Sequence, residues 1–268
     1  MESNNGIKLN RRQRSWNKFR KYVFIAGAAA AAVIIAFAAT RGRVGKTTNT
    51  YARATEQIAE DKTTEAQTSP AQESALKLAG PLKAERFTSA ESFKNSVFVG
   101  DTFVDGLDDY GLIDEYYLFQ SKFFPSTNAV KYVSDVAGMK PDKVFVMLGT
   151  DDANMNENVS THDVVENVSR VAAELKKALP AAKIYMISET PVTKEYEELG
   201  GLFYKQKTLD EINKGVEAKC KEMGVTYINI ADAFKTNGYL DLEYTTDGYH
   251  INQEYYPYVL NGIAKLIK

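Results

Sequence analysis

Hydrophobic positions divide this chain into three parts. Tyr22–Thr40 is a run of 19 uncharged, mostly apolar residues, which would extend about 28 Å as a helix and so match the hydrocarbon core of a membrane. Residues 41–86 are rich in Thr, Ala, Glu, Gln, Ser and Lys, and Tyr51 is their only aromatic residue. From Phe87 onward, short apolar runs alternate with amphipathic segments. That alternation is typical of a mostly parallel sheet covered by helices on both faces.

Within residues 87–268, five short apolar runs rich in β-forming residues are expected to form strands. These runs are Val97–Val99, Tyr116–Phe119, Lys143–Leu148, Lys183–Ile187 and Val225–Ile230. Apolar residues at helical spacing predict helices between and after them. The predicted helices are Asn128–Ala137, His162–Ala178 (capped by Thr161), Thr208–Met223 and Asn252–Ile267. The pattern predicts one α/β domain with three α/β/α layers and a central, parallel five-stranded sheet.

The charge around the apolar run predicts its orientation. Residues 1–21 carry seven basic residues and one acidic residue, and such a basic flank stays on the cytoplasmic side of a membrane. We therefore expect a cytoplasmic tail, a single-pass signal-anchor at Tyr22–Thr40, a flexible extracytoplasmic stalk over residues 41–86, and an extracytoplasmic domain at the cell membrane. A cleaved signal peptide stays open as an alternative, because Ala36-Phe37-Ala38 resembles a cleavage site.

Composition excludes several classes of function. The whole chain has a net charge of −2 and the basic tail has +6, so the remaining residues carry −8. An acidic domain is a poor ligand for polyanions, and no nucleic-acid partner is expected. One cysteine and two histidines leave little material for a metal site. The acidic residues Asp101, Asp105, Asp108 and Asp109 lack the spacing of a calcium loop, so neither a metal nor a cofactor is expected.

Three short motifs carry the candidate chemistry. Gly100-Asp101-Thr102 follows the first strand, Gly149-Thr150-Asp151-Asp152 follows the third, and Asp247-Gly248-Tyr249-His250 precedes the last helix. The carboxyl ends of parallel strands share one edge of a sheet, so these motifs can converge there. A hydroxyl, a histidine and an aspartate that orients it are the parts of a nucleophilic triad.

With these motifs, Ser92 to Lys268 resembles the SGNH/GDSL hydrolase family. That family has Gly-Asp-Ser, Gly-x-Asn-Asp and Asp-x-x-His at the three positions. The resemblance implies a flavodoxin-like sheet and a carboxylic-ester hydrolase acting on acylated carbohydrates, lipids or cell-wall polymers. It assigns the catalytic roles to Thr102, His250 and Asp247, and the oxyanion-hole positions to Thr102, Phe123 and Asp151.

Three departures from the family pattern bear on activity. The nucleophilic serine is Thr102, the oxyanion asparagine is Asp151, and the glycine expected after the second strand is matched by Phe123. Losing one oxyanion donor costs about 10²–10³ in rate, and a carboxylate in its place also repels the developing charge. We therefore expect impaired or lost ester hydrolysis.

Two functions stay open. In the first, the membrane-anchored domain binds a cell-wall glycan or a protein at the old cleft. In the second, the domain is an active esterase on acylated cell-surface carbohydrate or lipid, with a Thr102-His250-Asp247 triad. A buried Asp151 that stays protonated could donate a hydrogen bond to the oxyanion and would favour the second function.

Overall fold

The computed structural model describes residues 75–121, 124–155, 160–198 and 205–268. The basic tail, the apolar run Tyr22–Thr40, residues 41–74 of the predicted stalk, and Phe123 lie outside this description. Among the helices that are described, none has the length and apolar character needed to cross a membrane. The predicted anchor therefore stays a prediction.

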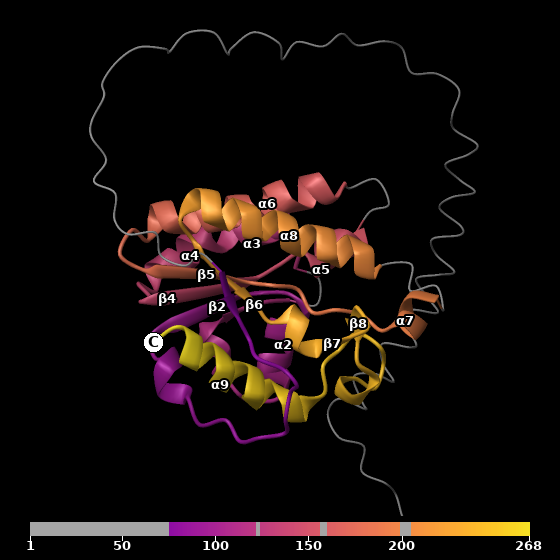
Figure 1. Cartoon of the computed structure of the whole chain (residues 1–268). Coiled ribbons are helices and arrows are strands. Elements are labelled where there is room, and N and C mark those ends of the chain that lie inside the picture. The colour runs from indigo at the N-terminus through magenta and orange to yellow at the C-terminus, as the bar shows by residue number, and fades with distance from the viewer. Residues whose placement is uncertain (1–74, 122–123, 156–159, 199–204) are drawn as a thin grey trace, which may run out of the picture. The chain divides into compact units, whose positions relative to one another are not determined.

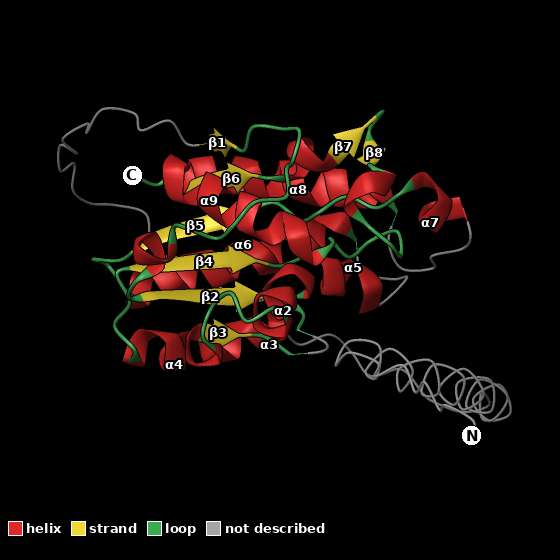
Figure 2. Ribbon diagram, turned by 90° about the horizontal axis from the view of Figure 1, so that it is seen from below, coloured by secondary structure: helices red, strands yellow, loops and turns green. Residues whose placement is uncertain are grey.

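The centre of the domain is a six-stranded parallel sheet with the order β1-β6-β5-β4-β2-β3 (Figure 2). Its strands are β1 Ala75–Lys77, β2 Ser96–Gly100, β3 Leu118–Phe119, β4 Lys143–Met147, β5 Lys183–Ile187 and β6 Thr226–Asn229. An antiparallel pair, β7 Lys235–Thr236 and β8 Tyr239–Leu240, lies apart from it. The α/β class is confirmed, and the expected five strands are corrected to six because β1 joins the sheet beside β6.

Helices cover both faces of the sheet (Figure 1). One face carries α3 Ser126–Ala129, α4 Val133–Gly138, α6 Thr161–Ala178 and α8 Gln206–Met223, and the other carries α2 Thr102–Asp109 and α9 Tyr256–Leu266. Two short helices are α5 Thr150–Met155 and α7 Lys194–Glu198. Single 3-10 turns are η1 Ala90–Phe93, η2 Glu115–Tyr117, η3 Val130–Tyr132, η4 Ala231–Phe234, η5 Leu242–Tyr244 and η6 Gln253–Tyr255. Alternating residues of the central strands face opposite layers, so Val97 and Val144 pack under α6 while Phe98 and Phe145 pack under α9.

Several predicted elements differ in detail from the structure. The expected helix Asn128–Ala137 is divided into α3, η3 and α4. The cap of α6 is Ser160 rather than Thr161, because Ser160 forms a reciprocal capping box with Asp163.

Residues 75–86, which composition assigned to the flexible stalk, are part of the folded domain. β1 pairs with β6, and Leu78 and Leu82 are buried against the layer that contains α9. Asn261 of α9 holds the segment that follows: its amide donates to the carbonyl of Arg86 at 2.8 Å, and its oxygen accepts from the Ser89 hydroxyl at 2.8 Å. Among the described residues, the folded domain therefore includes residues 75–86, which precede the boundary expected at Phe87. A three-residue strand is too short to show in a hydrophobic pattern.

Candidate active site

Asp101 ties together the loops that follow β2 and β4. The parallel register pairs Gly100 with Met147, so the two loops begin side by side. Asp101 is buried, and its Oδ2 accepts hydrogen bonds from the backbone N–H groups of Gly149 and Asp151, each at 3.2 Å. Gly149 has a φ of +141°, a conformation that glycine adopts without strain. The first two predicted motifs thus form one structural unit at the carboxyl edge of the sheet.

Thr102, the predicted nucleophile, is the first residue of α2 and is half-buried. The N–H groups in the first turn of a helix lack intrahelical partners and favour negative charge, so an oxyanion fits this position electrostatically. The next residue, Phe103, stacks on Tyr256 of α9 with ring centroids 4.4 Å apart. This packing brings α2 against the segment that follows His250. In the described part of the chain, no hydrogen bond joins the Thr102 hydroxyl to His250.

Asp247 and His250 form the pair that their spacing predicts. Oδ2 of Asp247 lies 2.7 Å from Nδ1 of His250, and Oδ1 accepts from the backbone N–H of His250 at 2.9 Å. Burial opposes the ionisation of Asp247, but the hydrogen bond and charge of His250 outweigh burial and lower the pKa of this carboxyl. An ionised Asp247 orients the imidazole through Nδ1 and leaves Nε2 to act as a base.

The start of α7 holds the turn that carries this pair. Gly248 has a φ of +96°, and a Cβ at this position would lie 2.8 Å from Cβ of Tyr196. The N–H of Thr193 donates to the carbonyl of Gly248 at 2.8 Å. The rings of Tyr196 and Tyr249 are 5.0 Å apart. α7 was not predicted from the sequence, yet it fixes the backbone between Asp247 and His250.

Asp151, which the family resemblance assigns to the oxyanion position, has a carboxylate where the family has an amide. It is 6% exposed, and its Oδ2 accepts from the N–H of Phe124 at 2.7 Å. Burial raises the pKa of Asp151 to about 6, although the Phe124 N–H partly opposes this rise. Phe123, the predicted second donor, is outside the described residues. Its neighbour Phe124 was not singled out from the sequence, and its N–H is already bound by Asp151.

Further buried carboxyl groups surround Asp151. Asp152 accepts from the N–H and the hydroxyl of Ser126, at 2.8 and 2.5 Å. Glu189, which follows β5, accepts a hydrogen bond from the Thr150 hydroxyl, and burial raises its pKa to about 8. Glu189 was also missed from the sequence, although its place directly after a strand was a signal. In the described ranges, no three His, Cys, Asp or Glu side chains are arranged to hold a metal ion.

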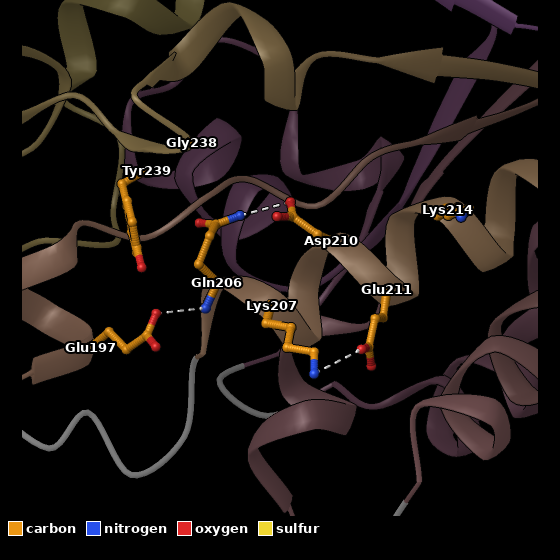
Figure 3. A pocket seen from close by; sticks show the side chains of 8 residues that line it. All are labelled: Glu197, Gln206, Lys207, Asp210, Glu211, Lys214, Gly238 and Tyr239. Carbon is orange, nitrogen blue, oxygen red and sulfur yellow. Dashed lines mark hydrogen bonds and ion pairs between the residues drawn. The ribbon is translucent and has the colours of Figure 1, made fainter.

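A pocket of about 370 Å³ lies away from these residues, between α7, α8 and the β7–β8 turn (Figure 3). Its polar groups largely satisfy one another: the N–H of Gln206 donates to Glu197 at 3.1 Å, and its side-chain amide donates to Asp210 at 2.8 Å. None of the predicted site residues lines the pocket. We therefore assign it to the packing of α7 on α8, and the candidate site stays at the carboxyl edge of the sheet.

A parallel sheet between two helical layers, with an Asp–His pair and a hydroxyl at its carboxyl edge, defines the class of α/β acyl hydrolases. Residues 125–256 match the model of the GDSL-like lipase/acylhydrolase family. The matched range includes Asp151, Asp247 and His250. The resemblance to SGNH/GDSL hydrolases is thus confirmed.

Solved structures agree with this fold. A candidate platelet activating factor from Streptococcus pneumoniae superposes with a TM-score of 0.54 at 17% identity, over 67% of this chain and 91% of its own. A GDSL-like lipase from Bacteroides thetaiotaomicron gives a TM-score of 0.50 at 20% identity, over 69% of this chain and 90% of its own. No curated protein matches the sequence. At these identities the likeness supports the fold, and function depends on the site.

Proposed function

We propose that this domain binds a cell-wall glycan beside Thr102, at the carboxyl edge of the sheet, and that its ester hydrolysis is strongly reduced. The observation that carries the proposal is the 2.7 Å hydrogen bond from the Phe124 N–H to the Asp151 carboxylate. A carboxylate cannot donate to an oxyanion when ionised, and here it also takes up a neighbouring backbone donor. With the Asp152 carboxyl close by, the site disfavours the negative charge that ester cleavage develops.

One observation supports the alternative, an active esterase. The Asp247–His250 pair has the geometry that a general base requires, with Nδ1 bound at 2.7 Å. In that reaction, Nε2 of His250 would take the proton of the Thr102 hydroxyl as its oxygen attacks the ester carbonyl. The alcohol would leave with that proton, and water would then release the acid from Thr102. A protonated Asp151 would be the donor that this route needs.

We further propose that Tyr22–Thr40 anchors the chain and that the domain lies outside the cytoplasmic membrane. The basic flank and the length of the uncharged run support this orientation. A wall glycan would then be within reach of the proposed site. An extracytoplasmic protein partner is the other ligand compatible with this location.

Hydrolysis of a short aryl ester by the purified full-length chain in detergent tests the proposal. We expect the wild-type rate to be close to background. Thr102→Ser with Asp151→Asn should raise it by about 10²–10³, because the amide supplies the missing donor. Adding His250→Ala to the double variant should remove the gain in rate. In a separate experiment, the wild type should co-sediment with purified wall glycan.

Three outcomes would contradict the proposal. A wild type with rapid hydrolysis that His250→Ala abolishes would establish the esterase. A folded double variant without activity would show that Thr102 and Asp151 do not form the site. Failure of the wild type to co-sediment with wall glycan would exclude the glycan as its ligand.

A further inference from the structure

Within the Asp247–His250 pair, the aspartate is held by more hydrogen bonds than the histidine. Oδ1 of Asp247 accepts from the backbone N–H groups of Tyr249 at 3.2 Å and of His250 at 2.9 Å. The same oxygen accepts from the Thr245 hydroxyl at 3.3 Å. In the described part of the chain, the imidazole of His250 has a single hydrogen bond, between Nδ1 and Oδ2 of Asp247. One such bond restrains the ring weakly, because the last torsion of a histidine side chain has broad energy wells.

The pair is also partly open to water. The side chains of His250 and Asp247 are 30% and 21% exposed. Water competes for hydrogen-bonding groups at such a position, so an interaction between charged partners there contributes little by itself. A fixed orientation of the imidazole therefore depends on packing against the ring.

The ring of Tyr249 provides this packing. Its centroid lies 3.7 Å from that of the His250 imidazole, and the two planes are tilted by 40°. Among the described residues, Tyr249 is the aromatic side chain that contacts this imidazole. Because the two rings are in van der Waals contact, the imidazole meets Tyr249 when it rotates away from Asp247.

Tyr249 is supported in turn by α7. The ring of Tyr196 lies 5.0 Å from the ring of Tyr249. The backbone N–H of Tyr196 donates to the Thr193 hydroxyl at 3.1 Å, and the N–H of Thr193 donates to the carbonyl of Gly248 at 2.8 Å. Three rings, those of Tyr196, Tyr249 and His250, thus form a row of successive contacts that begins on α7.

We propose that Tyr249 is a positioning residue whose ring keeps the imidazole of His250 against Asp247, and that Tyr196 supports the ring of Tyr249. A restrained imidazole keeps Nε2 in one direction, as a general base requires. The proposal rests on the contacts of the Asp247–His250 pair. It depends neither on ester hydrolysis nor on glycan binding.

Magnetic resonance of the full chain in detergent, with isotope-labelled histidine, tests the proposal. The chain has two histidines, His162 and His250, so two sets of ring signals are expected and His250→Ala assigns them. The proton on Nδ1 of His250 should exchange slowly with water because Asp247 binds it, whereas the ring of His162, exposed on α6, should exchange freely. Tyr249→Leu should speed the exchange at His250 by about 3- to 10-fold, because the contact between the rings is lost.

Three further variants separate the ring contact from other effects. Tyr249→Phe keeps the ring and should retain the slow exchange of the wild type. Tyr196→Leu should speed the exchange by a smaller factor than Tyr249→Leu, and it tests the same restraint if Tyr249→Leu does not fold. Tyr116→Leu, at a side chain on η2 that is 69% exposed, should behave like the wild type. Urea unfolding of each variant shows whether the domain is folded.

Three results would overturn the proposal. The first is a wild type whose Nδ1 proton on His250 is not protected. The second is unchanged exchange in folded Tyr249→Leu or, where that variant does not fold, in Tyr196→Leu. The third is equal acceleration in Tyr249→Phe and Tyr249→Leu, since the ring would then not be the restraint. None of these measurements involves an ester or a glycan, so this proposal and the proposed function fail separately.

Discussion

An aspartate and an asparagine have nearly the same shape, yet at residue 151 they direct hydrogen bonds in opposite senses. An asparagine amide could donate to an oxyanion, whereas the Asp151 carboxylate accepts from the N–H of Phe124. Burial partly relieves this conflict by raising the pKa of Asp151 to about 6. In the proposed site, the protonation state of Asp151 decides whether this position can stabilise an oxyanion.

Any ester hydrolysis by the wild type should decrease as the pH rises through about 6. The neutral Asp151 carboxyl can donate a hydrogen bond below this pH, and the ionised form repels the oxyanion above it. Rates of aryl ester hydrolysis from pH 5 to pH 8 would measure the effect. Asp151→Asn should lack the decline, since its amide does not titrate. A decline of equal size in both proteins would show that another group causes it.

Short elements determine the geometry of the site, and these elements were the hardest to predict. α6 and α8 were expected from their long helical pattern, and β4 from its apolar run. β1 has three residues and α7 has five, too few for a period to show in the sequence. Both form because of contacts with distant parts of the chain, β1 with β6 and α7 with Gly248.

The site residues also divide into those that the local sequence predicts and those that depend on contacts between distant parts of the chain. The Asp247–His250 contact was predictable because both residues lie in one turn, three positions apart. Phe124 and Glu189 meet Asp151 and Thr150 only through the arrangement of separate strands, and the position of Glu189 after β5 was the single local signal for either residue. Motifs thus predicted the chemical groups, while the fold determined which neighbours modify them.

Gly248→Ala tests the role of α7 against a matched glycine. Its new Cβ would lie 2.8 Å from Tyr196, whereas Gly238, with a similar φ of +86°, has nothing within 4 Å of such an atom. Both variants carry the strain of a positive φ, so only Gly248→Ala adds the steric clash. We expect it to lower the free energy of unfolding by about 1–3 kcal/mol more than Gly238→Ala, as measured in urea. Equal losses would mean that α7 does not restrain the turn.

At the scale of the whole molecule, the folded domain of the family begins earlier than composition suggests. Residues 75–86 pack on α9, so the flexible connection expected from composition is confined to residues before Ala75. The predicted anchor at Tyr22–Thr40 precedes it in the sequence. The basic residues 1–21 predict that the domain lies outside the cytoplasmic membrane, and this prediction is open to direct test.

Protease added to intact cells stripped of their wall should release the domain. Cleavage is expected between residues 41 and 74, where composition predicts a flexible chain. The released fragment should retain Ala75 and the residues that follow it, as mass spectrometry of its N-terminus would show. Complete protection of the chain in intact cells, with cleavage only after lysis, would place the domain in the cytoplasm.

The position of β1 also determines how the domain would respond to mechanical force. β1 is an edge strand and the first described element, so a pull on the chain before Ala75 acts directly on the sheet. β1 and β6 run parallel over three register pairs. A pull along the strand loads their hydrogen bonds together in shear, not one after another as in peeling. Leu78 and Leu82, buried behind the strand, would have to leave the core before the load passed further into the domain.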